Sequence, residues 1–294
     1  MVFFIRFINK SFDCLCLFNL FNSLINLTKE RITMKKLLFL FIALSLAAFG
    51  CKDSSTDTEE TEHHHGDQTL NVRFYPTWGA NAFQMNTNYN TTNDVVKFTM
   101  AQFYVSEVSL IDSNGVAYPA DGIKLINIST LNANGYVEAS FLTDAEPGSY
   151  RGIKFSIGVP FEENHQDVSK QTEPLGPNSG MFWSWNYGYI FHALEGKFDS
   201  AGTSKDFVFH QGTDNMKSVI GLYSMEEPKT SFTLLHNTPS TFSVNLDYKK
   251  AFSKGLNTAN EVNLKANPAE RVSHGGVMAA QVNINLRDAF TRKN

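Results

Sequence analysis

The chain has 294 residues, with 25 Lys and Arg against 29 Asp and Glu, which gives a formal net charge of −4. This balance excludes a nucleic-acid-binding protein that works by bulk positive charge. Apolar residues make up 42% of the chain, beside 19 Gly and 9 Pro, so the chain as a whole is neither fibrous nor disordered and can build a sizeable core.

The N-terminal part has the pattern of an export signal. From Met34 the chain reads MKKLLFLFIALSLAAFGC, with two lysines, an apolar run from Leu37 to Phe49, and then Cys51. The run is shorter than the roughly 20 residues of a membrane-spanning helix. We predict a lipoprotein signal peptide over residues 34–50, and a lipid on Cys51 that anchors the protein to the bacterial outer membrane, facing the periplasm or the cell surface. A secreted protein without the lipid is the alternative.

Two segments beside this signal do not have the composition of a folded domain. Residues 1–33 lack a period and precede a complete signal with its own methionine, so we interpret them as an over-extended N-terminus. Residues 51–67 are acidic and polar, which predicts an unfolded tether. This tether contains His63, His64 and His65, which fit either a loose metal-binding tract or a solvated polar run.

Residues 68–294 have the pattern of one all-β domain. Alternating apolar residues recur in segments that are separated by turn-forming sequences such as DSNG and NANG. These segments are 70–75, 95–111, 123–129, 136–142, 150–159, 206–210, 230–236 and 241–248. We predict a single antiparallel β-sandwich or barrel-like domain with little helix. Helix candidates are 251–260 and 278–290, although the sequence VNINL in the second fits a strand equally well.

The sequence contains no G-x-S-x-G, phosphate-binding loop, dinucleotide glycine fingerprint or H-E-x-x-H. The standard hydrolase, nucleotide-binding and zinc-protease hypotheses therefore have no support. We predict that the protein is not an enzyme, and a redox enzyme remains a hypothesis without a motif of its own.

Aromatic residues concentrate in MFWSWNYGYIF at 181–191, and three histidines flank this run. Strand periodicity places one set of rings on a single face, which comprises Trp183, Trp185, Tyr187 and Tyr189. A well-filled core with satisfied histidines is one interpretation. A ligand site is the other, because His165 follows a Val159-Pro160 strand exit and is expected on a loop.

Four segments, in order, carry a resemblance to a known family. They are FYVSEVSL at 103–110, GVPFEENHQD at 158–167, MFWSWNYGYIFHALEGKF at 181–198 and FVFHQG at 207–212. Together they resemble the MbnP-like family of extracytoplasmic copper-binding proteins, which are associated with methanobactin, and the resemblance covers most of residues 70–290. It implies a β-sandwich-like domain in the periplasm or at the cell surface. It also implies a copper site of histidine nitrogens beside a tryptophan that a dihaem partner, related to the MauG peroxidases, oxidises to kynurenine.

Transferred to this chain, the resemblance assigns His165 and His210 as copper ligands and Trp183 or Trp185 as the oxidised side chain. The thioether of Met181 would favour Cu(I), since soft ligands select that ion. His192 is a weaker ligand candidate. The remaining side chains considered fit structural or polar surface positions, and they are Glu195, His236 and His274.

Two main functions follow. The first is a copper-binding lipoprotein for capture, storage or transfer, which requires His165 and His210 to converge near a tryptophan. The second is a surface carbohydrate- or ligand-binding module, which requires the aromatic face to be open to solvent.

Overall fold

The computed structural model of this protein describes residues 68–293 except 185–186, 227–230 and 254–260. The predicted signal peptide, Cys51, the tether with His63 to His65, and Trp185 lie outside the described residues. Within these ranges, none of the helices has the length and hydrophobicity needed to cross a membrane.

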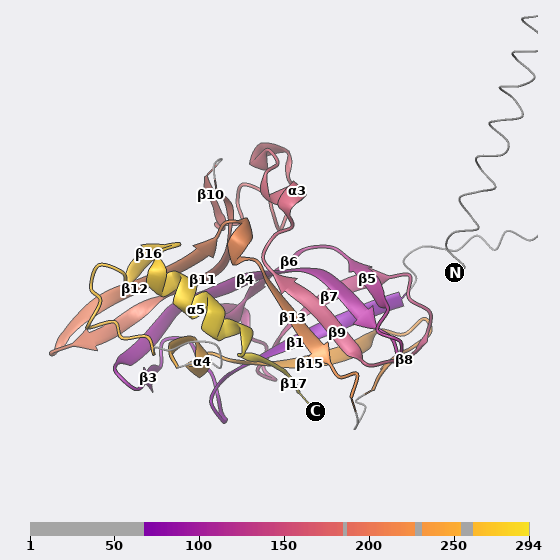
Figure 1. Cartoon of the computed structure of the whole chain (residues 1–294), viewed down its shortest axis with the longest axis horizontal. Coiled ribbons are helices and arrows are strands. Elements are labelled where there is room, and N and C mark those ends of the chain that lie inside the picture. The colour runs from indigo at the N-terminus through magenta and orange to yellow at the C-terminus, as the bar shows by residue number, and fades with distance from the viewer. Residues whose placement is uncertain (1–67, 185–186, 227–230, 254–260, 294) are drawn as a thin grey trace, which may run out of the picture. The chain divides into compact units, whose positions relative to one another are not determined.

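In the described part of the chain, fifteen strands join in one curled sheet, and two more form a small separate pair (Figure 1). The strands are β1 (Gln68–Trp78), β2 (Asn81–Ala82), β3 (Asn88–Asn90), β4 (Val95–Ile111), β5 (Ala117–Asp121), β6 (Lys124–Asn127), β7 (Val137–Thr143), β8 (Gly148–Tyr150), β9 (Gly152–Ile157), β10 (Phe182–Ser184), β11 (Gly188–Ser200), β12 (Thr203–Gly212), β13 (Ser218–Tyr223), β14 (Phe232–Leu234), β15 (Ser240–Asp247), β16 (Val272–His274) and β17 (Phe290–Arg292). The helices are α3 (Phe161–Asn164), α4 (Lys249–Phe252) and α5 (Val277–Arg287), with 3-10 turns η1 (Ile128–Thr130), η2 (Val168–Lys170) and η3 (Asp214–Met216).

The predicted all-β class is confirmed, but the sheet is mixed rather than antiparallel throughout. Its main path runs β16-β12-β11-β4-β5-β7-β1-β15-β17. The pairs β1–β15 and β12–β16 are parallel. Parallel neighbours need long connections, and both pairs join segments far apart in the chain. Alternation within each strand carries no information about such pairings, which is why the sequence did not predict them.

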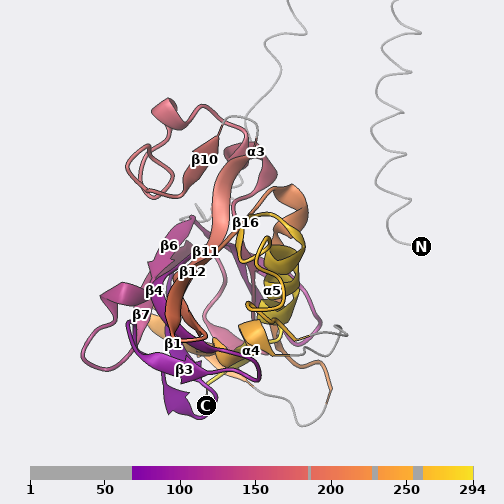
Figure 2. The same cartoon turned by 90° about the vertical axis from the view of Figure 1, so that its left-hand side faces the viewer.

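The main core forms where the sheet curls over itself. The burial of β1 alternates along its whole length, so every second side chain points inward. The Phe74 ring of β1 meets Phe103 of β4 at 5.5 Å and Phe155 of β9 at 5.9 Å between ring centroids. The tail segment forms helix α5 followed by strand β17. This helix packs against β12, β13 and β16 on the inner side of the sheet (Figures 1 and 2).

A second, smaller cluster of buried side chains holds the segment that carries α3 and β10. Figure 2 shows this segment at one end of the sheet, above β11. The Tyr104 hydroxyl of β4 donates to the Pro174 carbonyl at 2.9 Å, and the Tyr189 hydroxyl of β11 donates to the Leu175 carbonyl. The Tyr104 and Tyr189 rings meet edge to face at 5.8 Å. These contacts tie the connection before β10 to β4 and β11, and β10 itself pairs antiparallel with the start of β11.

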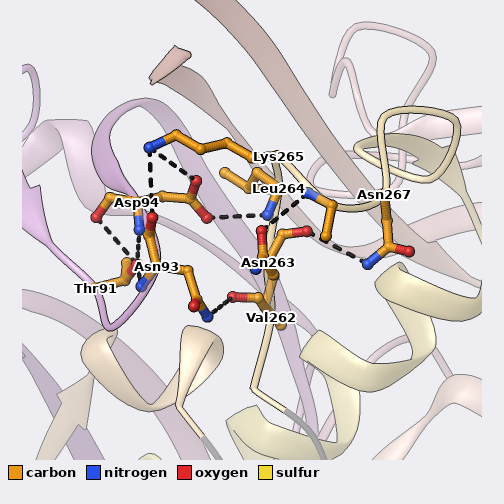
Figure 3. Close-up of polar contacts among 9 residues, drawn as sticks. Thr91, Asn93, Asp94, Val262, Asn263, Leu264, Lys265 and Asn267 are labelled. Carbon is orange, nitrogen blue, oxygen red and sulfur yellow. Dashed lines mark hydrogen bonds and ion pairs between the residues drawn. The ribbon is translucent and has the colours of Figure 1, made fainter. Parts of the chain in front are cut away.

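A polar latch holds the chain that leads to β16 (Figure 3). The buried Asp94 accepts a hydrogen bond from the Leu264 backbone N–H at 2.9 Å, and the Lys265 ammonium lies 3.8 Å from its other carboxylate oxygen. A carboxylate at the end of one loop thus fixes a segment about 170 residues further along the chain. Residues 262–267 are thereby tied to the sheet before the chain enters β16.

Candidate metal site on the outer face of the sheet

Three neighbouring strands, β11, β12 and β16, present polar side chains on the face of the sheet opposite to the core. Alternation places Leu194 and Phe209 inward, where both are buried, and Glu195 and His210 outward. The parallel pairing of β12 with β16 sets His274 beside His210. The site therefore depends on the strand pairing that the sequence did not predict.

Hydrogen bonds fix the tautomer of His210. Its Nε2 lies 2.8 Å from Glu195 Oε1, and its Nδ1 lies 3.0 Å from the Nδ1 of His274. An ionised carboxylate only accepts hydrogen bonds, so the neutral His210 ring carries its hydrogen on Nε2 and donates it to Glu195. The Nδ1 lone pair of His210 is then directed at His274.

The surroundings of the second imidazole disfavour its charged form. The pKa of His274 is lowered from 6.5, chiefly by partial burial and further by the adjacent His210, while Glu195 acts in the opposite direction. A neutral imidazole is the form that binds metals. Two nitrogens 3.0 Å apart can both reach one ion, because a bond from imidazole nitrogen to a metal such as zinc is about 2.0 Å long.

Aromatic rings border the histidine pair on the β10 side. The Trp183 ring lies 5.2 Å from the His274 ring, and Tyr187 stacks on Trp183 at 5.0 Å between centroids. Trp183 is half-buried, whereas Tyr187 is 50% exposed. The site thus combines two facing imidazoles, one carboxylate and one indole at a solvent-accessible edge.

A comparison with protein families settles the kinship of this chain, because the family model described as MbnP matches residues 67–274. The chain belongs to the MbnP family. The solved structure of MbnP from Methylosinus trichosporium is similar to it, with a TM-score of 0.44 and 18% sequence identity over 72% of this chain and 82% of that chain. Among curated protein sequences, none matches this chain.

In this MbnP-family chain, His165 has a different set of neighbours from His210. It follows α3, its Nε2 lies 2.9 Å from Asp214 Oδ2, and its ring lies 4.5 Å from that of Phe161. The adjacent Asn164 donates to the other oxygen of Asp214 at 2.9 Å. Of the ligands predicted from sequence, His210 is therefore the one that the structure places beside a tryptophan and a second histidine.

Two further candidates, Met181 and His192, are each 1% exposed. Met181 belongs to the second buried cluster, against which Trp183 packs. His192 lies on the inner face of β11, where its ring contacts Phe103 at 5.1 Å and Tyr248 at 6.2 Å. Burial lowers the pKa of His192 to about 3, so this ring stays neutral inside the core.

The predicted aromatic face along 183–189 is wrong, because the chain reverses within it. Strand β10 ends at Ser184 and β11 begins at Gly188, whose φ is +72°. A side chain at Gly188 would place a Cβ 2.1 Å from Asn164 Oδ1, so glycine is required for this turn. Tyr189 is consequently buried, and Trp183 meets Tyr187 across the turn rather than along a strand.

Sequence analysis missed the contacts of Glu195 and His274 with His210. Glu195 is a diagonal neighbour of His210 in the β11–β12 hairpin, since Ala193 pairs with His210 and Glu195 with Val208. Pairing the two strands outward from the turn sequence FDSAGTSKDF would have shown that Glu195 and His210 are neighbours. No local sequence pattern indicates the contact between His274 and His210, because the two residues are 64 positions apart in the chain.

Within the described ranges, no group of three or more His, Cys, Asp or Glu side chains is arranged to hold a metal ion. A groove of about 890 Å³ lies elsewhere, between β4, β5, β9 and the connection that follows α3. None of the described site residues predicted from sequence lines it. The histidine pair of this MbnP-family protein is therefore a two-nitrogen site at a strand edge rather than a closed cage.

Proposed function

We propose that this protein is an extracytoplasmic copper-binding lipoprotein that captures, stores or transfers copper through His210 and His274 beside Trp183. The observation that carries the proposal is the 3.0 Å approach of the two Nδ1 atoms, one of which presents a lone pair fixed by Glu195. Imidazole nitrogen suits copper, and Cu(I) accepts low coordination numbers, so two such donors already make a chemically reasonable site.

Family membership supports this choice of metal. The MbnP family is extracytoplasmic and is linked to copper handling through methanobactin, in agreement with the export signal predicted at residues 34–50. The copper ion is the cargo of the protein, and nothing in the proposal requires turnover. We therefore propose a binding protein rather than an enzyme.

Trp183 is the described tryptophan best placed to take part. Its ring is 5.2 Å from that of His274. Oxidation to kynurenine by a dihaem partner related to the MauG peroxidases, with dioxygen or two equivalents of peroxide as the oxidant, would cleave the C2–C3 bond of the indole, and hydrolysis would release C2 as formate. The aryl amine and ketone that remain would supply further donor atoms next to the histidine pair. Mass spectrometry of the peptide that contains Trp183, from protein isolated from its native host, tests this modification.

Competition titration with a Cu(I) chelator of known affinity tests the histidine pair. Every protein in the series is the full chain with His63, His64 and His65 replaced by Ala, so that the tether adds no binding. We expect His210→Ala and His274→Ala each to weaken Cu(I) binding by more than about 100-fold, because each removes a nitrogen that faces the ion.

Two other histidines provide the comparison. His236 is hydrogen-bonded to Asn237, so His236→Ala is the matched control and should leave the affinity unchanged. His165→Ala should also bind normally, since Asp214 holds its Nε2. Loss of binding in His165→Ala together with normal binding in His274→Ala would overturn the assignment and restore the ligand pair predicted from sequence.

The lipid anchor has its own test. Cys51→Ala should move the protein from the membrane fraction to the soluble extracytoplasmic fraction, because the thiol is the site of lipid attachment. Incorporation of labelled palmitate into the wild-type chain and its absence from Cys51→Ala would support the anchor. Equal fractionation of both proteins would contradict it.

A further inference from the structure

Resting on the copper function proposed above, we propose that Glu195 is the positioning residue of the site and that it holds His210 in the tautomer that leaves Nδ1 free for the metal. Glu195 would not touch the ion. It would act through His210, as the carboxylate partners of metal-bound histidines do.

The strand register places the carboxylate for this role. Ala193 pairs with His210 across the β11–β12 ladder, so Glu195, two residues further along β11, is the diagonal neighbour on the same face. Its Oε1 is 2.8 Å from His210 Nε2, with the two side chains 31% and 15% exposed. A hydrogen bond with this degree of shielding is retained in competition with water better than one on an open surface.

The chemistry of imidazole gives this contact its consequence. A neutral ring carries one hydrogen, on either Nδ1 or Nε2. With Glu195 present, the hydrogen stays on Nε2 and the Nδ1 lone pair faces His274. Without the carboxylate, His210 can place its hydrogen on Nδ1 and donate it to His274, and the atom that should bind copper is then blocked.

The two imidazoles therefore differ in function. His210 is the fixed ligand, since its tautomer is set before the metal arrives. In the metal-free protein, His274 must supply the hydrogen that lies between the two Nδ1 atoms, 3.0 Å apart. When copper binds, this hydrogen leaves Nδ1 for solvent and Nε2 takes one up, so that the His274 ring stays neutral and its Nδ1 lone pair becomes free.

Two readouts on the full chain with Ala at positions 63–65 test the proposal. The first is the protonation pattern of the ring nitrogens in the metal-free protein, measured by ¹H–¹⁵N NMR and assigned by comparison with His210→Ala. The second is the Cu(I) affinity from chelator competition. For the wild type we expect the Nε2–H form of His210. For Glu195→Leu we expect a shift toward Nδ1–H and a loss of about 10- to 100-fold in affinity.

Conservative and matched variants separate positioning from packing. Glu195→Gln keeps an acceptor oxygen, so this variant should retain the Nε2–H tautomer of His210 and most of the Cu(I) affinity. Asp206→Leu removes a different carboxylate from the same hairpin, one that pairs with Lys197, and should change neither readout. Unchanged tautomer and affinity in Glu195→Leu, or weak binding that Gln does not rescue, would overturn the positioning role.

The outcome also distinguishes this inference from the function on which it rests. If the wild type binds no Cu(I), the copper function fails, and the NMR readout still decides whether Glu195 sets the His210 tautomer. If the wild type binds tightly and Glu195→Leu binds equally well, the positioning role alone fails.

Discussion

The two faces of the β11–β12 hairpin use the same kind of side chain in different ways. On the inner face, His192 is 1% exposed among aromatic rings, and its Nε2 has no hydrogen-bond partner within the described residues. On the outer face, His210 has a partner on each ring nitrogen, Glu195 on one side and His274 on the other. One ring fills space in the core, and the other is oriented and accessible.

The difference shows what makes a histidine a ligand candidate. Burial lowers the pKa of His192 on the inner face and that of His274 on the outer face, so a neutral ring, the form that a metal needs, is found on both. Only the outer face adds a carboxylate partner that sets the tautomer and a second nitrogen at 3.0 Å. Residue type and strand position in the sequence are similar for His192 and His210, so neighbours rather than composition separate their roles.

The largest expected contrast between the faces is in stability. Phe209→Ala on the inner face should lower the free energy of unfolding by about 3–5 kcal/mol, because it opens a cavity in a fully buried aromatic cluster. His210→Ala, one residue further on the outer face, should cost less than about 1 kcal/mol. Urea denaturation measures both values. Equal losses would mean that the outer pair is part of the stabilising core.

Low pH should destabilise the fold through His192 on the inner face. Folding lowers the pKa of His192 from 6.5 to about 3. Between these two pKa values, His192 binds a proton in the unfolded chain but not in the folded chain. The free energy of unfolding therefore decreases as the pH decreases through this range. At about pH 4 the loss from this group should reach about 3 kcal/mol relative to neutral pH.

The control for this acid effect is His192→Phe, which keeps an aromatic ring against Phe103 and removes both nitrogens. The free energy of unfolding, measured by denaturation at several pH values from neutral to acid, should decrease less with falling pH in the variant than in the wild type. The same pH dependence in both proteins would show that the acid sensitivity arises from other groups and that His192 is not buried as described.

Local patterns predicted much of this fold. The alternation and apolar content of residues 95–111 predicted a strand whose bounds match β4, and the apolar alternation of 241–248 predicted β15. Such patterns describe which face of a strand is buried, and they are silent about which strand lies alongside. The parallel pairs β1–β15 and β12–β16 therefore came from the structure alone.

The site was predictable only in part for the same reason. His210 and Trp183 were selected from their motifs, and the structure places both beside His274. His274 itself gave no signal, because its role depends on a parallel pairing 64 residues away. The aromatic run was wrongly predicted to be one strand. The turn at Gly188 depends on Asn164, which leaves no room for a side chain there, and local alternation does not reveal such a tertiary contact.

Substitutions in the polar latch of Figure 3 test how firmly residues 262–267, which lead to β16, are tied to the sheet. Asp94→Ala should lower the free energy of unfolding by about 2 kcal/mol, since the Leu264 N–H loses a buried acceptor. Lys265→Met should cost less than about 1 kcal/mol, because the lysine is 44% exposed. Comparing the two by urea denaturation separates the hydrogen bond from the ion pair. Equal costs would assign the latch to the charge contact instead.

The smallest expected effect is that of Tyr187, and it distinguishes the two functions predicted from sequence. Tyr187→Ala removes a half-exposed ring stacked on Trp183, which should cost less than about 1 kcal/mol in stability. It should leave Cu(I) affinity unchanged, because no nitrogen of the pair is altered. A carbohydrate-binding module would behave differently. Its exposed platform, already reduced by the burial of Tyr189, would depend on this ring, so calorimetric oligosaccharide binding that disappears in Tyr187→Ala would favour the platform over the metal.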